Sequence, residues 1–224
     1  GRYSTDASHY QVEPLGVVVP RNEQDLLTAL EIAREEDVPV LPRGGGTSQC
    51  GQTVGEALVI DVSKHLNDVL EHDPDTGEIE VQPGIGLDDL NRILAPHKQM
   101  FMVDVSTSSR ATIGGMAGNN SCGARSIRYG TMRDNVLEID AVMADGARHR
   151  FGEVPPGRTR NGVDDAYADL ARDLLNLGSR EAAEIAARFP RLLRRVGGYN
   201  IDALVPGLSN RPGGSQPNLA HLLV

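Results

Sequence analysis

Three consecutive glycines, Gly44 to Gly46, stand between Arg43 and the hydroxyl pair Thr47-Ser48, and this loop limits what the chain can become. Glycine has no Cβ, so main-chain N–H groups can approach a ligand closely. Successive amides in such a turn form a concave anion site. Arg43 adds a guanidinium group suited to phosphate. Because glycine clusters are also ordinary surface turns, the loop alone leaves both interpretations open.

Two familiar nucleotide motifs fail at this loop. Gly46 to Thr53 has the spacing of a Walker A loop, but Gln52 occupies the lysine position, which disfavours an NTPase. A G-x-G-x-x-G motif begins at Gly44 but reaches Gln49 in place of its last glycine. No long helix is signalled directly after the loop, so a Rossmann site is also disfavoured.

The segments before the loop predict a strand–helix–strand unit. Leu15 to Val19 is a short apolar run, and Asp37 to Leu41 is a second strand ended by Pro42. Between them, Asn22 can cap a helix that has Asp25 at its third position. A right-handed βαβ unit would put the loop at the C-terminal edge of a parallel pair, where ligands bind in α/β sheets.

Further elements follow along the chain. We expect a buried strand, a hairpin, a helix with Leu87, Leu90, Ile93 and Leu94 on one face, a second hairpin turning at Asp145-Gly146, helices in residues 163 to 196, and a terminal strand. The strands and helix are predicted at Ala57 to Val62, Leu66 to Glu71, Glu78 to Val81, Leu87 to Ala95, Asn135 to Met143, His149 to Phe151 and Leu219 to Val224.

Two features near the end of the chain are open to more than one interpretation. Arg191, Arg194 and Arg195 would share one helical face, which is usually solvated but could meet a substrate carboxylate. Asn210 to Ser215 is expected to be a mobile loop. The terminal apolar run stops without a turn, which suggests a truncated strand.

A second region, Thr112 to Gly123 followed by Arg128-Tyr129-Gly130, is dense in small residues and side-chain donors. It would serve either as a tight helix–loop packing site or as a ligand site. Two such segments in one small domain suggest that both face one extended ligand.

Composition excludes several classes of protein. The 224 residues are 39% hydrophobic and 24% charged, which predicts a globular chain with a core. The net charge of −9 argues against a nucleic-acid surface, and no apolar run approaches the ~20 residues of a membrane span. Two cysteines, Cys50 and Cys122, suit a reduced, cytoplasmic compartment, and the scattered histidines suggest no metal site. The chain begins at Gly1 without Met, so we expect a piece of something longer.

The motifs together resemble the FAD-binding domain of the vanillyl-alcohol oxidase/p-cresol methylhydroxylase (PCMH) superfamily, and more narrowly the flavin domain of FAD-linked 2-hydroxyacid dehydrogenases and oxidases. The residues that carry the resemblance span nearly the whole chain: Leu15 to Pro20, Pro42 to Gly51, Thr112 to Gly123, Arg128 to Gly130 and Gly197 to Asn200. Gly1 to Gln11 is similar to bacterial forms fused to iron–sulfur segments, so a cluster would belong to other parts of the parent protein.

The resemblance implies an α+β fold with two lobes and FAD between them. A small βαβ-containing lobe would span about 12–72, and a larger mixed-sheet lobe about 76–224, with a helical insertion at about 156–215. The family's C-terminal substrate domain would be absent from this chain.

The resemblance also implies the cofactor contacts. FAD would be non-covalent, because Thr47 stands where some relatives have a flavin-linked histidine. The residues expected at the diphosphate are Pro42, Arg43, Gly44, Gly45, Gly46, Thr47, Ser48 and Gly51. Those expected along the other side of FAD, towards the ribityl chain and the flavin ring, are Thr112, Gly114, Gly115, Asn119, Ser121 and Gly123. Arg128, Tyr129 and Gly130 would lie near the flavin, and Val136 on the adenine side.

The implied activity is oxidation of a D-2-hydroxy acid, with an unassigned electron acceptor. No residue is assigned as the catalytic base, so the chain by itself is expected to be inactive. Two alternatives stay open: a flavoenzyme similar to UDP-N-acetylenolpyruvoylglucosamine reductase, and a non-catalytic module that binds a phosphorylated metabolite.

Overall fold

The computed structural model describes residues 1–154, 165–192, 195–208 and 216–224. The chain forms two compact units: one contains Gly1–Met116 and Ala144–Gly146, the other Ala117–Met143 and Ala147–Val224. Helices and strands occur in both units, which confirms the predicted α+β class. The lobe boundary near residues 72–76 and the helical insertion remain predictions.

The first unit contains a three-stranded parallel sheet made of β1 (Gly16–Val18), β2 (Val40–Arg43) and β3 (Leu58–Asp61). The strand order is β1-β3-β2, so β3 lies in the centre, and its Val59 and Ile60 are buried. The expectation that the first two strands pair directly is wrong, because β3 lies between them and pairs with both. The loop after β2 still leaves the sheet at its C-terminal edge.

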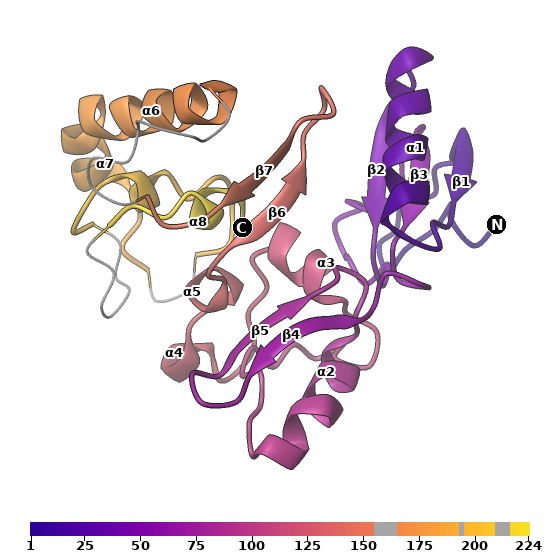
Figure 1. Cartoon of the computed structure of the whole chain (residues 1–224), viewed down its shortest axis with the longest axis horizontal. Helices are drawn as coiled ribbons and strands as arrows, with labels where there is room; N and C mark the ends of the chain where they lie inside the picture. Colours follow the sequence, from indigo (N-terminus) through magenta and orange to yellow (C-terminus); the bar gives the residue numbers. More distant parts are fainter. Residues whose placement is uncertain (155–164, 193–194, 209–215) are drawn as a thin grey trace. The chain divides into compact units, whose positions relative to one another are not determined.

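Helix α1 (Glu23–Glu35) connects β1 to β2 and lies along this sheet (Figure 1). The side chain of Asn22 accepts a hydrogen bond from the Asp25 amide at 2.8 Å, which confirms the predicted cap. Ala29 and Ala33 are the buried residues of the helix. After the helix Asp37 adopts φ 53°, a left-handed conformation that turns the chain towards β2.

Strand β2 continues through Pro42 to Arg43, whereas the sequence predicted that Pro42 would end it. Proline cannot donate a hydrogen bond, but β2 is an edge strand and pairs only with β3. The missing N–H therefore costs no ladder hydrogen bond, and the strand carries Arg43 to the start of the glycine loop.

The remainder of the first unit is the predicted hairpin, β4 (Val69–Asp73) with β5 (Glu78–Val81), followed by α2 (Leu87–Leu94) and the 3₁₀ turn η1 (Ala95–His97). Ile85, Leu90 and Leu94 form a buried cluster against the hairpin. Ile93 was expected on the same face but is 45% exposed. The buried face of this eight-residue helix is formed by Leu87, Leu90 and Leu94, and Ile93 lies outside it.

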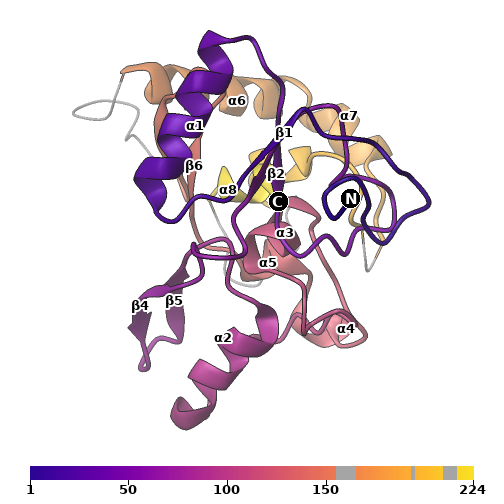
Figure 2. The same ribbon diagram turned by 90° about the vertical axis from the view of Figure 1, so that its right-hand side faces the viewer.

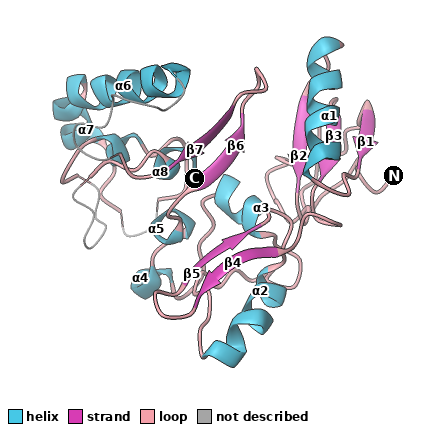
Figure 3. Cartoon of the chain, in the orientation of Figure 1, coloured by secondary structure: helices cyan, strands magenta, loops and turns pink. Residues whose placement is uncertain are grey.

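In the residues that the structure describes, the second unit combines helices of different lengths with the β6–β7 hairpin (Figure 3). Helix α3 (Ile113–Gly118) leads into it from the first unit. Its elements are α4 (Ser126–Tyr129), α5 (Met132–Asn135), β6 (Ile139–Val142), β7 (Arg148–Phe151), α6 (Asp165–Arg180), α7 (Ala182–Arg188), η2 (Ile201–Leu204) and α8 (Ala220–Leu223).

Two strands predicted in this unit include residues that the structure shows to be helical. Asn135 belongs to α5, where its side chain donates to the carbonyl of Thr131 at 2.8 Å, so the strand begins only at Ile139. The apolar run Leu219–Val224 contains the helical turn α8, and Asn218, two residues before its start, accepts a hydrogen bond from the Ala220 amide at 2.8 Å. Short apolar runs do not distinguish a strand from a buried helical turn.

The predicted arginine face is also wrong. Helix α7 ends at Arg188, just before Pro190, and Arg191 and Arg195 lie outside any helix. Arg194 lies outside the described residues, as do Asn210 to Ser215. Among the helices that the structure describes, none is both long and apolar enough to cross a membrane.

Candidate cofactor-binding site

The glycine loop presents a run of unpaired main-chain donors. Within the part of the chain that the structure describes, no hydrogen bond is made by the amide of any residue from Gly44 to Gln49. The first amide after them, at Cys50, donates to the Ser48 hydroxyl at 3.2 Å. A main-chain N–H group without a hydrogen-bond acceptor is unfavourable where water is excluded. Several such groups in succession are therefore suited to bind an anionic ligand.

Within the first unit, the glycine loop packs closely against residues 110–112, at the start of the second glycine-rich region. A Cβ at Gly44 would lie 2.1 Å from the Thr112 hydroxyl oxygen, and one at Gly45 would lie 2.0 Å from the Arg110 carbonyl oxygen. Neither position has room for a side chain. The glycine loop and residues 110–112 are thus in direct contact, and a ligand shared by the two glycine-rich segments stays a prediction.

The Arg43 side chain makes hydrogen bonds inside the first unit. Its guanidinium is buried and donates to the carbonyls of Thr53 at 2.9 Å and Thr5 at 2.8 Å. Gly46, at φ 66°, lies over the same guanidinium, where a Cβ would approach its Nη2 to 2.6 Å. The arginine therefore links the residues on either side of the loop, and a contact of Arg43 with phosphate stays a prediction.

The other candidates in the first unit have mixed positions. Thr47 is half-buried, whereas the Ser48 hydroxyl donates to the Gln52 side chain. Pro42 is on the exposed edge strand, and Gly51, at φ 77°, packs against the Tyr10 ring. Only Thr47 keeps a hydroxyl with no hydrogen bond to the described residues.

The start of the second region is packed as tightly as its small residues suggest. The Gly114 amide donates to the Pro83 carbonyl at 2.8 Å, and a Cβ at Gly114 would meet the Pro83 Cβ at 2.6 Å. Thr112 is buried, and its hydroxyl accepts from the exposed Gly115 amide at 3.3 Å. Gly114 thus has a packing role, while Thr112 adjoins Gly44 of the glycine loop and Gly115 lies next to Thr112.

The rest of this region belongs to the second unit. The Asn119 side chain is exposed and donates to the Ser121 hydroxyl at 3.0 Å, and the Gly123 amide donates to Ser126 at 2.9 Å. At Gly130, φ is 80° and a Cβ would lie 2.6 Å from the Asp134 Cβ. The guanidinium of Arg128 lies 5.3 Å from the Tyr129 ring centroid. Val136 is buried, and its carbonyl accepts from His221 at 2.9 Å.

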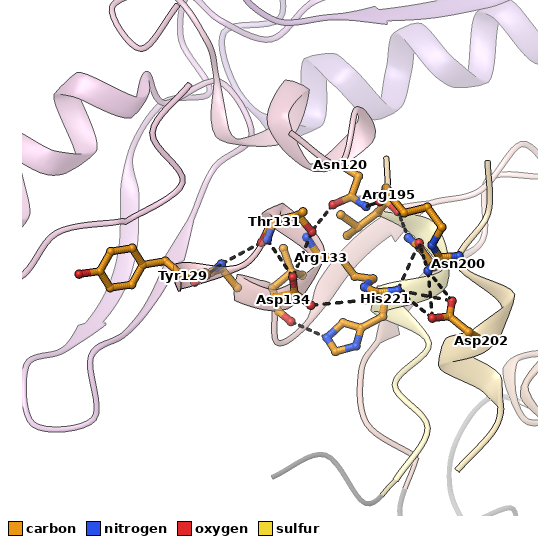
Figure 4. Close-up of polar contacts among 12 residues, drawn as sticks. Asn120, Tyr129, Thr131, Arg133, Asp134, Arg195, Asn200, Asp202 and His221 are labelled. Carbon is orange, nitrogen blue, oxygen red and sulfur yellow. Dashed lines mark hydrogen bonds and ion pairs between the residues drawn. The ribbon is translucent and has the colours of Figure 1, made fainter. Parts of the chain in front are cut away.

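A buried polar network holds this part of the second unit together (Figure 4). Arg195 donates to both carboxylate oxygens of Asp202 at 2.9 Å, and Arg133 reaches the same carboxylate at 3.2 Å. Asn120 accepts from the Arg133 amide at 3.0 Å. The side chain of Asn200 accepts from both arginines and donates to the Val224 carbonyl at 2.6 Å.

Sequence reasoning missed most of this network. Arg195 was assigned to a helical face, and Arg133, Asp202 and His221 were given no role. Asn200 had a signal, because it ends the Gly197 to Asn200 motif that carries the family resemblance. The search for metal sites found no group of three or more suitable ligands among the described residues.

Known proteins resemble much of this chain. The FAD binding domain family matches residues 14–152. D-2-hydroxyglutarate dehydrogenase of Pseudomonas putida is 34% identical, and that of Escherichia coli 39%, each over 88% of this chain and 20% of the relative. Glycolate oxidase subunit GlcD of Bacillus subtilis is 38% identical over 67% of this chain and 32% of the relative.

Solved structures agree on the fold. An alkyldihydroxyacetonephosphate synthase superposes with a TM-score of 0.54 at 23% identity, covering 58% of this chain and 24% of that one. The chain spans about a fifth of the length of the curated dehydrogenases that it matches. The family match covers more than half of the chain and includes both the glycine loop and the whole second region, so the chain belongs to the FAD binding domain family.

Proposed function

We propose that this chain is the FAD-binding part of an FAD-dependent dehydrogenase or oxidase that acts on a D-2-hydroxy acid. The observation that carries the proposal is the run of unpaired amides from Gly44 to Gln49 at the C-terminal edge of a parallel sheet. The likeness to D-2-hydroxyglutarate dehydrogenases and to a glycolate oxidase subunit supports the choice of substrate class.

The residues fit a diphosphate at the glycine loop. Main-chain donors from Gly44 to Ser48, with the Thr47 hydroxyl, would bind its oxygens, and the close contact of Gly45 with Arg110 fixes the loop from behind. FAD would be non-covalent, because a threonine hydroxyl at position 47 does not form the histidine–flavin link.

The remaining contacts are proposed from the family resemblance. The ribityl and flavin end of FAD would contact Thr112, Gly115, Asn119, Ser121 and Gly123, and then Arg128, Tyr129 and Gly130. Val136 would lie on the adenine side. We omit Arg43 and Gly114 from the direct contacts, because their groups are engaged inside the protein.

Bound FAD would supply the hydride acceptor that turns a 2-hydroxy acid into a 2-oxo acid once a base has taken the hydroxyl proton. This chain's own task would be to bind and orient FAD, and we assign the base and most substrate contacts to the remainder of a longer protein. The electron acceptor is unassigned, and a cytoplasmic location is part of the proposal because both described cysteines are free thiols.

Flavin titration of the 224-residue chain tests the cofactor. Quenching of flavin fluorescence should show FAD binding, and FMN should bind more weakly because it lacks the adenylate half that the site would hold. ADP should compete with FAD. Equal affinity for FAD and FMN would contradict a dinucleotide site, and a chain that takes up no flavin would favour the phosphometabolite module.

The longer protein that contains this domain tests the substrate. Under anaerobic conditions and without an added electron acceptor, D-2-hydroxyglutarate, D-lactate and glycolate should each be compared as reductants of the bound flavin. Bleaching of the flavin by one of these acids, and not by its L-enantiomer where one exists, is the expected result. Bleaching by NADPH alone would favour the reductase alternative.

A further inference from the structure

Residues 1–12 form a strap that folds back on itself beside the glycine loop. Thr5 and Gln11 make an antiparallel bridge, and the Val12 amide donates to the Ser4 carbonyl at 3.0 Å. Ser4 is buried within it. Figure 2 shows this segment as the indigo chain that curls back near the N-terminus before it enters β1.

The strap is tied to both ends of the loop. At the start, Arg43 donates one guanidinium nitrogen to the Thr5 carbonyl at 2.8 Å and another to the Thr53 carbonyl at 2.9 Å. At the end, the Thr53 hydroxyl donates to the Asp6 carboxylate at 2.9 Å. One arginine therefore links the strap, the beginning of the loop and its end.

Two further contacts fix the strap to the sheet and to the side of the loop. The Tyr3 hydroxyl donates to Asp61 at the end of β3 at 2.8 Å. The Tyr10 ring covers Gly51, where a Cβ would lie 2.5 Å from its Cδ2. Burial and the hydrogen bond to Asp61 raise the pKa of Tyr3 above its usual value.

The carboxylates at both tying points are held in their charged form. Burial would raise the pKa of Asp61, but hydrogen bonds from Ser63 and Tyr3 lower it below the ordinary value. Burial would also raise the pKa of Asp6, and hydrogen bonds from Ser8 and Thr53 outweigh it and lower the pKa. Charged acceptors make stronger hydrogen bonds, so the ties are firm at neutral pH.

The strap contacts residues on either side of the glycine loop, and it makes no hydrogen bond to the main-chain amides from Gly44 to Gln49. We propose that the 1–12 strap is a positioning element of the cofactor site: Tyr3, Thr5 and Asp6 hold the glycine loop in the shape that presents its free amides to the diphosphate. This inference rests on the proposed function. A strap that merely covered the sheet would leave the order of the loop unchanged when its ties to Thr53 and Asp61 are cut.

The test cuts two ties with nearly isosteric changes in the 224-residue chain. Tyr3→Phe removes one hydroxyl, and Thr53→Val removes the other; the single variants and the double variant are compared. Thr53→Ser keeps the hydroxyl and should restore the tie. Thr76→Val is the matched control, because that hydroxyl bonds within the β4–β5 turn, to the Glu78 amide at 3.3 Å and to the Asp73 side chain, and not to the strap or the glycine loop.

Two readouts are measured on each variant. Labelling with [¹⁵N]glycine reports the nanosecond order of the Gly44, Gly45 and Gly46 amides through the heteronuclear NOE, and the Gly84 amide, bonded to Leu66 at 2.7 Å, shows in the same spectrum that the unit is folded. Fluorescence titration gives the dissociation constant for FAD. The expected result is loss of loop order and about a tenfold rise in this constant for the double variant.

The outcomes separate this inference from the proposed function. Unchanged loop order in a folded double variant, or FAD binding as tight as in the unaltered chain, overturns the positioning role alone. An unaltered chain that binds no FAD overturns the proposed function and the use of the strap with it. Loss of order with weaker binding, restored by Thr53→Ser and absent from Thr76→Val, supports the proposal.

Discussion

The substitution Gly45→Ala tests the geometry of the loop most directly. The Gly45 main chain lies so close to the Arg110 carbonyl that a Cβ would be 2.0 Å from its oxygen. The atom in the way belongs to the backbone, so no side chain can rotate to make room. Because Cβ atoms do not approach other heavy atoms within 3.0 Å, the two segments must move apart by about 1 Å.

This displacement affects stability and cofactor binding to different degrees. Overpacking of this kind costs about 1–3 kcal/mol of the free energy of unfolding. A shift of about 1 Å also breaks hydrogen bonds, whose donor–acceptor distances cover only about 2.7–3.2 Å. Losing one bond to a charged phosphate oxygen costs roughly 1.5–3 kcal/mol, so we expect FAD affinity to fall about tenfold to a hundredfold.

The assay is an FAD titration at a temperature where the variant is folded, with urea unfolding measured in parallel. Gly55→Ala is the matched control in the same unit, since a Cβ there would make an ordinary 3.5 Å contact with Leu41. The control should bind FAD normally. Normal FAD affinity in folded Gly45→Ala would refute the argument that the amides next to Arg110 form the diphosphate site.

Three other predictions concern stability, each measured by urea unfolding. Asp202→Asn should destabilise the second unit by about 3 kcal/mol, because it removes the carboxylate that the largely buried Arg195 shares with Arg133, and Arg133 keeps only the more distant Asp134; an unchanged midpoint would contradict this. The lowered pKa of Asp61 gives stability that is complete above the ordinary value of 3.8 and is lost as the pH falls below it, so Asp61→Asn should flatten the acid limb of the pH–stability curve. Asn22→Ala should cost about 1 kcal/mol through the lost helix cap, and a neutral result would mean that water replaces the cap fully.

The sequence was reliable where neighbouring residues decide the structure. The cap at Asn22, the hairpin turn at Asp145-Gly146 and the buried strand that ends at Asp61 are all present. In each case, the deciding interaction joins residues a few positions apart or follows from an unbroken apolar run. The family assignment was also available, because it depends on motif spacing along the chain and not on contacts across it.

The tertiary structure decided the roles of the charged side chains and the ends of several elements. Arg43 looks like a phosphate ligand in sequence, but Thr5 and Thr53 supply nearby carbonyls that bind it inside the loop. Arg195 looks like part of a basic helix, but Asp202 draws it into a buried ion pair. A long cationic side chain binds the hydrogen-bond acceptors that the fold brings near it. Those acceptors lie far away in sequence or in a different element, so the local sequence does not reveal them. What the sequence determined by itself was the glycine loop and its family, and what only the folded chain decided was which of its polar groups stay free for a ligand.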